Sequence, residues 1–125
     1  MVTFVPQKRE YNSVLPVVEA YAALANGHTY CDYAYHLILT NPTKNILEEE
    51  LPPLVKEQGI TSVKIYMTYD PLRLGDREIL NIMVATRKLG MTTMIHAENH
   101  DMISLCVLFF FAAAAVLNGP DKQHH

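Results

Sequence analysis

The stretch Thr61-Ser-Val-Lys-Ile-Tyr-Met-Thr68 carries the strongest secondary-structure signal in the chain. Its density of β-branched and aromatic residues, broken by one lysine, is typical of a strand buried on both sides. A helix is expected next, capped by Asp76, running through Leu89 and stopped by Gly90. Another strand, Met91 to His96, follows it. Strand, helix and strand joined by short connections predict right-handed βαβ units that build a parallel sheet.

The sequence before this stretch continues the alternation. It predicts a helix that Asn12 or Ser13 caps and that Gly27 ends, and then a buried strand from Thr29 to Thr40. A further helix is expected from Asn45 to Gly59, and two consecutive prolines in its middle must kink it or split it into two short pieces. The predicted fold class is α/β, with about three parallel strands and flanking helices.

Length and composition limit what the chain can be. It has 125 residues, 50% of them hydrophobic and 18% charged, which is typical of one globular domain. A complete (β/α)8 barrel needs roughly 250 residues, so a family of that size can be present only in part. With 13 acidic and 10 basic residues and a net charge of -3, the sequence has no basic block for nucleic acid or an anionic membrane. Small, weakly charged partners are expected.

The two cysteines, Cys31 and Cys106, are too few for a disulfide framework and too far apart for a Cys-x-x-Cys motif. The first residues also lack the pattern of a secretory signal. A reducing compartment is therefore expected, and we predict a cytoplasmic location.

Polar residues within or just after the predicted strands are the candidates for chemistry, because catalytic groups of α/β proteins gather there: His36, Lys64, Tyr69 and His96. The amine of Lys64 lies in a strand that otherwise reads as buried, so it must pair with a carboxylate, lose its charge or be modified. Alternatively, its stem packs while its ammonium reaches solvent. Neighbouring strands lie about 5 Å apart, so Lys64 and His96 can face one ion or a pair of ions.

The other candidates also have simpler interpretations. His36 is better explained as a core histidine with satisfied hydrogen bonds, and His96 taken alone as a core or loop residue. Tyr69 can donate its phenol to a polarised carbonyl or merely fill the rim of the sheet with an aromatic ring.

Four blocks in order resemble the central part of the dihydropyrimidinases, which belong to the hydantoinase branch of the amidohydrolase superfamily. They are Tyr30-Cys-Asp-Tyr-Ala-Tyr-His36, Glu49-Glu-Leu-Pro-Pro-Leu-Val55, Ile60-Thr-Ser-Val-Lys-Ile-Tyr-Met-Thr-Tyr69 and Met94-Ile-His-Ala-Glu-Asn99. The resemblance implies that residues 1–101 form part of a (β/α)8 barrel. It also implies a hydrolase that opens cyclic amides such as dihydropyrimidines and hydantoins.

In that family two zinc ions are bridged by a carboxylated lysine. The block match implies that Lys64 is this bridge, that His96 is a zinc ligand and that Tyr69 is the catalytic tyrosine that binds substrate and stabilises the oxyanion. A desolvated, neutral lysine amine can add carbon dioxide, and the carbamate offers two oxygens to the metals.

The resemblance also has gaps. The family's His-x-His pair, a further histidine and an aspartate on other barrel strands have no counterpart in this sequence. We therefore expect the chain to be incomplete and inactive alone. The alternative is a non-catalytic fragment or interaction protein that associates, as a homo-oligomer or otherwise, through exposed sheet edges. The related collapsin response mediator proteins lack this lysine and this tyrosine, so their presence favours the enzyme branch.

Residues 102–125 do not resemble the family. The segment from Met102 to Gly119 has no charge, so it lacks the polar face of a barrel's outer helix. Three interpretations stay open: a buried or interface helix, a membrane span, or translated sequence joined to a genuine barrel fragment.

Overall fold

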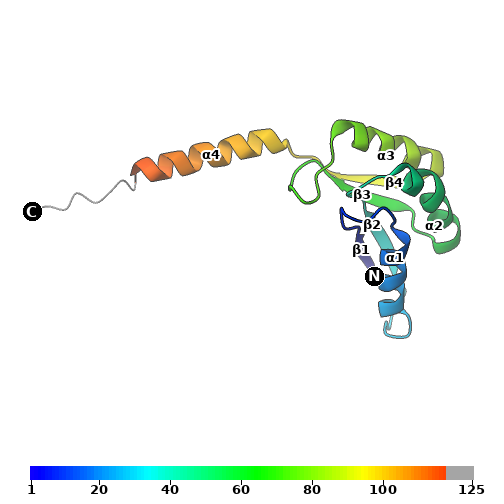
Figure 1. Cartoon of the computed structure of the whole chain (residues 1–125). Coiled ribbons are helices and arrows are strands. Elements are labelled where there is room, and N and C mark those ends of the chain that lie inside the picture. Colours follow the sequence, from blue (N-terminus) through cyan, green and yellow to red (C-terminus); the bar gives the residue numbers. More distant parts are fainter. Residues whose placement is uncertain (118–125) are drawn as a thin grey trace, which may run out of the picture.

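The structure is a computed structural model and describes residues 1–117. Its elements are β1 (Val2–Pro6), α1 (Leu15–Ala25), β2 (Ala34–Ile38), the π-helical turn η1 (Ile46–Glu50), α2 (Leu51–Gln58), β3 (Ser62–Tyr66), α3 (Asp76–Leu89), β4 (Thr92–His96) and α4 (His100–Leu117). All strand pairs are parallel and the sheet order is β1-β2-β3-β4 (Figure 1). The predicted α/β class is confirmed.

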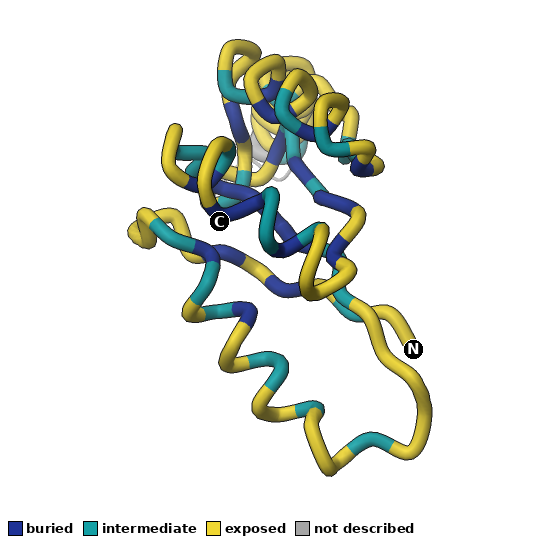
Figure 2. Tube along the Cα trace, turned by 90° about the vertical axis from the view of Figure 1, so that its right-hand side faces the viewer, coloured by how far each residue is buried: buried dark blue, intermediate teal, exposed yellow. Residues whose placement is uncertain are grey.

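One face of the sheet is packed and the other is open. The core consists of alternate strand residues together with the inner sides of the helices and the connecting segments: Val5, Val14, Val18, Leu37, Leu39, Ile46, Leu51, Leu54, Ile60, Val63, Ile65, Leu74, Ile79, Ile82 and Met91. In Figure 2 these buried positions concentrate in the middle of the molecule, while the outer turns of the helices are exposed. The intervening strand residues lie on the opposite face, which no described helix covers.

The sheet has four strands within the described residues, one more than predicted. The additional strand is β1, which pairs with β2 from Val2 opposite Ala34 to Pro6 opposite Ile38. Five residues ending in proline give a weak local signal, and the strand forms because β2 provides hydrogen-bonding partners on one side. β1 and β4 are the two edges of the sheet.

The predicted strand from Thr29 to Thr40 is shorter in the structure, where β2 spans only Ala34–Ile38. Its neighbour β1 begins opposite Ala34, so the preceding residues have no strand to pair with. Tyr30 in that preceding segment is fully exposed.

Two predicted helix caps are wrong. α1 begins at Leu15 after Val14, whose backbone N–H donates to the buried carboxylate of Glu50 at 2.8 Å. Its predicted cap Ser13 only accepts a bond from Leu15 N at 3.3 Å, and Asn12 does not cap it. A distant carboxylate thus replaces the local cap.

In α3, Asp76 is the first helical residue and Gly75 takes the cap position. The Gly75 N–H donates to the Glu78 carboxylate at 2.8 Å, so the side chain of the first turn closes the helix start.

The predicted interruption by two prolines is confirmed. The helix divides between Glu50 and Leu51, and Pro52 and Pro53 then occupy the first turn of α2, where amide donors are not required.

Gln7 joins the carboxyl ends of β1 and β2. Its side chain is buried and donates to the carbonyls of Tyr11 at 2.8 Å and Asn41 at 3.1 Å. Its side-chain carbonyl accepts from the N–H groups of Thr40 at 3.0 Å and Asn41 at 3.1 Å. All the hydrogen-bonding capacity of this amide is therefore used, as a buried amide requires.

α4 projects away from the sheet and the other helices (Figure 1). Its residues from Asp101 to Ala113 are exposed, so the interpretation of a helix buried within this chain is wrong. Within residues 1–117 no helix is long and apolar enough to cross a membrane. The predicted tail extends to residue 125, and its last eight residues lie outside the described part.

Candidate functional site

The register between β3 and β4 places Lys64 and His96 on the same face of the sheet. Lys64 is opposite Met94, and Tyr66 is opposite His96. Register partners in a parallel pair point to the same side, and side chains alternate along each strand. Val63 and the residue at 65 belong to the packed core, so Lys64, Tyr66 and His96 lie on the open face.

The ring of Tyr66 lies between the two candidate ligands. Lys64 Nζ is 5.1 Å from the centroid of this ring, which is within the range of a cation–π contact. The His96 imidazole stacks on the same ring with centroids 5.5 Å apart and an interplanar angle of 26°. Tyr66 thus contacts both a potential nitrogen nucleophile and a potential nitrogen ligand.

Tyr69 completes the group through an unusual backbone conformation. Its φ is 68°, in the left-handed region, which costs an ordinary residue roughly 1–2 kcal/mol. Its carbonyl accepts from the N–H groups of Leu72 at 2.8 Å and Arg73 at 2.9 Å, so the turn fixes this conformation. The Tyr69 ring lies 5.2 Å from His96 and 6.0 Å from Tyr66, centroid to centroid.

These four residues, Lys64, Tyr66, Tyr69 and His96, are called the Lys64 cluster below. The structure therefore brings together the three site residues singled out in the sequence. It adds Tyr66, which the sequence reasoning missed although strand alternation alone puts it on the same side as Lys64.

His96 has an unused nitrogen. Its Nε2 lies 3.3 Å from a Glu98 carboxylate oxygen, an ion-pair distance, but the direction is not that of a hydrogen bond. This nitrogen is buried and has no hydrogen-bond partner among the described residues. Buried polar atoms are normally paired, so an unpaired imidazole nitrogen suits a ligand absent from the chain itself.

The same residues do not form a complete metal site. In residues 1–117 no group of three or more His, Cys, Asp or Glu side chains is close enough to hold a metal ion. Lys64 and His96 supply at most two donors, whereas zinc usually takes four ligands. A zinc pair at the Lys64 cluster would need ligands from other barrel strands.

The remaining histidines of this region have partners. His36 shares the open face, and its Nδ1 contacts the Ser62 hydroxyl while its ring lies 5.2 Å from Phe4. This contact agrees with the favoured interpretation of a satisfied histidine.

His100, interpreted from the sequence as a loop residue, begins α4. Its ring lies 3.3 Å from the Thr68 hydroxyl and 3.5 Å from the Asp70 carboxylate. The contact ties α4 to the carboxyl end of β3, and no local sequence signal pointed to it.

A polar hollow of about 550 Å³ lies at the carboxyl ends of the strands. Residues of the loops after β3 and β4 line it, among them Asp70, Arg73, Glu98 and Asn99. Arg9, from the loop after β1, also lines it and donates to the carbonyls of Pro71 and Arg73. In parallel α/β folds substrates bind at this end of the sheet.

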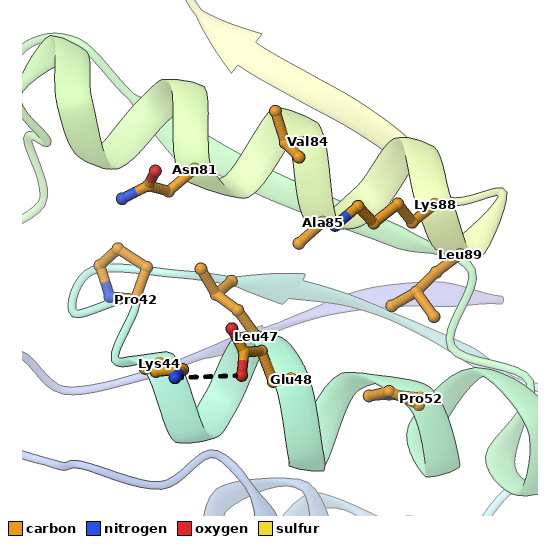
Figure 3. A pocket seen from close by; sticks show the side chains of 10 residues that line it. All are labelled: Pro42, Lys44, Leu47, Glu48, Pro52, Asn81, Val84, Ala85, Lys88 and Leu89. Atoms are coloured by element: carbon orange, nitrogen blue, oxygen red, sulfur yellow. Dashed lines mark ion pairs between the residues drawn. The ribbon is translucent and has the colours of Figure 1, made fainter.

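A second hollow, of about 590 Å³, is separate from the Lys64 cluster (Figure 3). It lies between η1, α2 and α3, with Leu47, Pro52 and Val84 along its walls. Lys44 and Glu48 form an exposed ion pair of 3.7 Å at its edge. Its lining contains no histidine or cysteine, so it offers little chemistry.

Comparisons with known proteins agree on one family. No protein-family profile matches the chain. The D-hydantoinase of Geobacillus stearothermophilus is 39% identical over 87 residues, which are 69% of this chain and 18% of that protein. The D-hydantoinase of Rhizobium radiobacter is 36% identical over 104 residues, 81% of this chain and 22% of that protein. The chain therefore spans about a fifth of the length of these curated relatives.

A solved structure shows the same fold. A D-hydantoinase structure matches with a TM-score of 0.78 and 32% identity, over 90% of this chain and 24% of that one. The open four-stranded sheet therefore corresponds to one part of a hydantoinase barrel.

Proposed function

Since this chain belongs to the dihydropyrimidinase and hydantoinase family and corresponds to an internal part of its barrel, we propose that it supplies part of the active site of a zinc-dependent cyclic-amide hydrolase. The substrates are cyclic amides of the kind that the relatives' names give, hydantoins and dihydropyrimidines. Residues 1–101 form the contributing barrel domain in this proposal.

The observation that supports it is the Lys64 cluster on the open face. In a closed barrel this face becomes the interior, where water is excluded and metal ligands from other strands converge. When bound, a pair of zinc ions supplies an activated water and polarises the ring amide. The unpaired Nε2 of His96 is the donor that this chain offers to them.

Lys64 is the second donor in the proposal. Its nitrogen adds to carbon dioxide, a C–N bond forms, and one proton leaves the nitrogen, giving a carbamate with a negative charge shared by two oxygens. Tyr66 holds the lysine stem and its nitrogen on the open face through the contact at 5.1 Å.

Tyr69 binds substrate. Its phenol is half exposed and stands beside His96, at the carboxyl end of β3, where a substrate carbonyl can approach from the polar hollow. The hydroxyl donates to the carbonyl oxygen, and the bond strengthens as negative charge develops there.

The chain by itself does not turn over substrate in this proposal, because two donors do not hold two metal ions. We also place it in the cytoplasm, where the exposed, unpaired Cys31 and Cys106 stay reduced.

A segment exchange tests the proposal. The matched segment of the Geobacillus stearothermophilus D-hydantoinase is replaced by the corresponding residues of this chain, and zinc content and hydantoin hydrolysis are measured. Retention of both is expected, while the isolated chain shows neither. A smaller exchange, covering only residues 62–69 and 92–99, serves if the larger hybrid does not fold. A folded hybrid of either kind that lacks zinc and activity would contradict the proposal.

A further inference from the structure

The described part of α4 has no polar face. Its exposed apolar side chains follow one another along more than two turns, so they point in every direction around the axis. They are Met102, Ile103, Leu105, Val107, Leu108, Phe109, Phe110 and Phe111, exposed by 38–73%. No residue from 102 to 117 is charged. Helices that are apolar all round are normally covered on all sides.

The start of α4 is held where the helix cannot lie on its own sheet. The Asn99 side chain accepts from Met102 N at 2.9 Å, and His100 contacts Thr68 and Asp70 at the carboxyl end of β3. From that anchor the helix runs outward, away from α3 (Figure 1). Its cover must therefore come from another molecule.

A second copy of this chain is the partner that the helix fits. A phenylalanine has on the order of 200 Å² of surface, so the eight exposed side chains present roughly 800 Å² of apolar area. That equals what each partner contributes to a stable interface of standard size. Two copies bring the same uncharged surface, so neither buries an unpaired charge against the other.

We propose that α4 is a self-association element that pairs with α4 of other copies of this chain, two helices covering one side and a four-helix bundle covering all sides. A lipid bilayer can also cover such a helix, but within residues 1–117 no helix is long and apolar enough to cross one. This proposal does not depend on the proposed hydrolase function.

Sedimentation of the full-length chain provides the first test. We expect a dimer or larger assembly at about 100 µM, a concentration at which even weak specific contacts are occupied. The variant Leu108→Glu should sediment as a monomer, because its carboxylate would be buried in the pair. Leu24→Glu is the matched control, since Leu24 on α1 is 73% exposed and Leu108 is 65% exposed, and it should leave the assembly unchanged.

Cross-linking identifies the contacting helix. Cys106 lies near the middle of α4, so two copies approach each other there in either helix orientation, within about 8 Å for a pair centred on the helix. A short bis-maleimide should link Cys31→Ser chains and fail to link Cys106→Ser chains. Equal linking of both variants, or a monomeric wild-type chain, would overturn the proposal. So would a chain that stays monomeric in buffer and floats with phosphatidylcholine vesicles.

Discussion

Tyr66 and His96 are register partners at the carboxyl ends of β3 and β4, and their rings stack with centroids 5.5 Å apart. The pairing is a property of the sheet, since the two residues are thirty positions apart in the sequence. It places one aromatic ring in contact with Lys64, Tyr69 and His96 together. Tyr66 therefore organises the cluster that carries the proposed chemistry.

Replacement of Tyr66 should show this organising role. Tyr66→Leu removes the stack and should lower the free energy of unfolding by about 1 kcal/mol, the typical worth of an aromatic pair. Urea denaturation measures this loss, and the ¹H shifts of the His96 ring should move because the ring current disappears. Tyr66→Phe should restore both quantities. Identical His96 shifts in the leucine and phenylalanine variants would show that the rings do not stack in solution.

Lys64→Ala in the segment-exchanged hydantoinase should abolish zinc binding and hydrolysis together. The reason is that the proposed bridge between the metal ions is lost with the amine. Zinc content by atomic absorption and hydantoin turnover are the two measurements. Lys88→Ala is the control, because Lys88 lies on the exposed side of α3, and it should retain both. Loss of turnover with full zinc content would contradict the bridging role.

Tyr69→Phe in the same enzyme should lower kcat by about 10²-fold to 10³-fold with zinc content unchanged, the usual effect of removing one oxyanion donor. The ring and its contact with His96 stay in place, so stability should change little. Metal analysis beside steady-state kinetics separates the two effects. A tyrosine that only fills the rim would give wild-type kcat in the phenylalanine variant.

Gln7→Ala should be among the most destabilising polar substitutions in the chain. It leaves two carbonyls and two N–H groups at the ends of β1 and β2 without partners in a buried place, at a cost of about 3 kcal/mol. Thermal or urea unfolding followed by circular dichroism measures the change. Gln58→Ala, at the exposed end of α2, is the matched control and should stay within about 0.5 kcal/mol of wild type. Equal stability of the two variants would exclude the proposed role of the buried amide.

Stability should also fall in alkaline solution because of Tyr35. Burial, and in second place the neighbouring Tyr33, raise the pKa of the Tyr35 phenol above its ordinary value. The native state then holds this proton more tightly than the unfolded state. The contribution to stability is complete below about pH 10 and is lost as the pH rises through the folded-state pKa.

Urea unfolding at several pH values up to about 11 tests this prediction. Tyr35→Phe should be less stable at neutral pH by about 1 kcal/mol, because the hydrogen bond from the phenol to the Tyr21 carbonyl is lost. Its stability should then decline less steeply above pH 10 than that of the wild type. Parallel curves for the two proteins would rule out Tyr35 as the source.

The sequence by itself determined the α/β class, the order of most elements and the family resemblance, because hydrophobic periodicity and turn residues act over a few neighbouring positions. It placed Lys64, Tyr69 and His96 among the candidates by residue type and block match. Only the tertiary structure added β1, which forms because a neighbouring strand provides its partners. Tertiary structure also put Lys64 and His96 on one face and Tyr66 between them, since strand register joins residues far apart in the chain. The exposure of α4 likewise follows from the contacts of His100 with another strand's end, which no local pattern encodes.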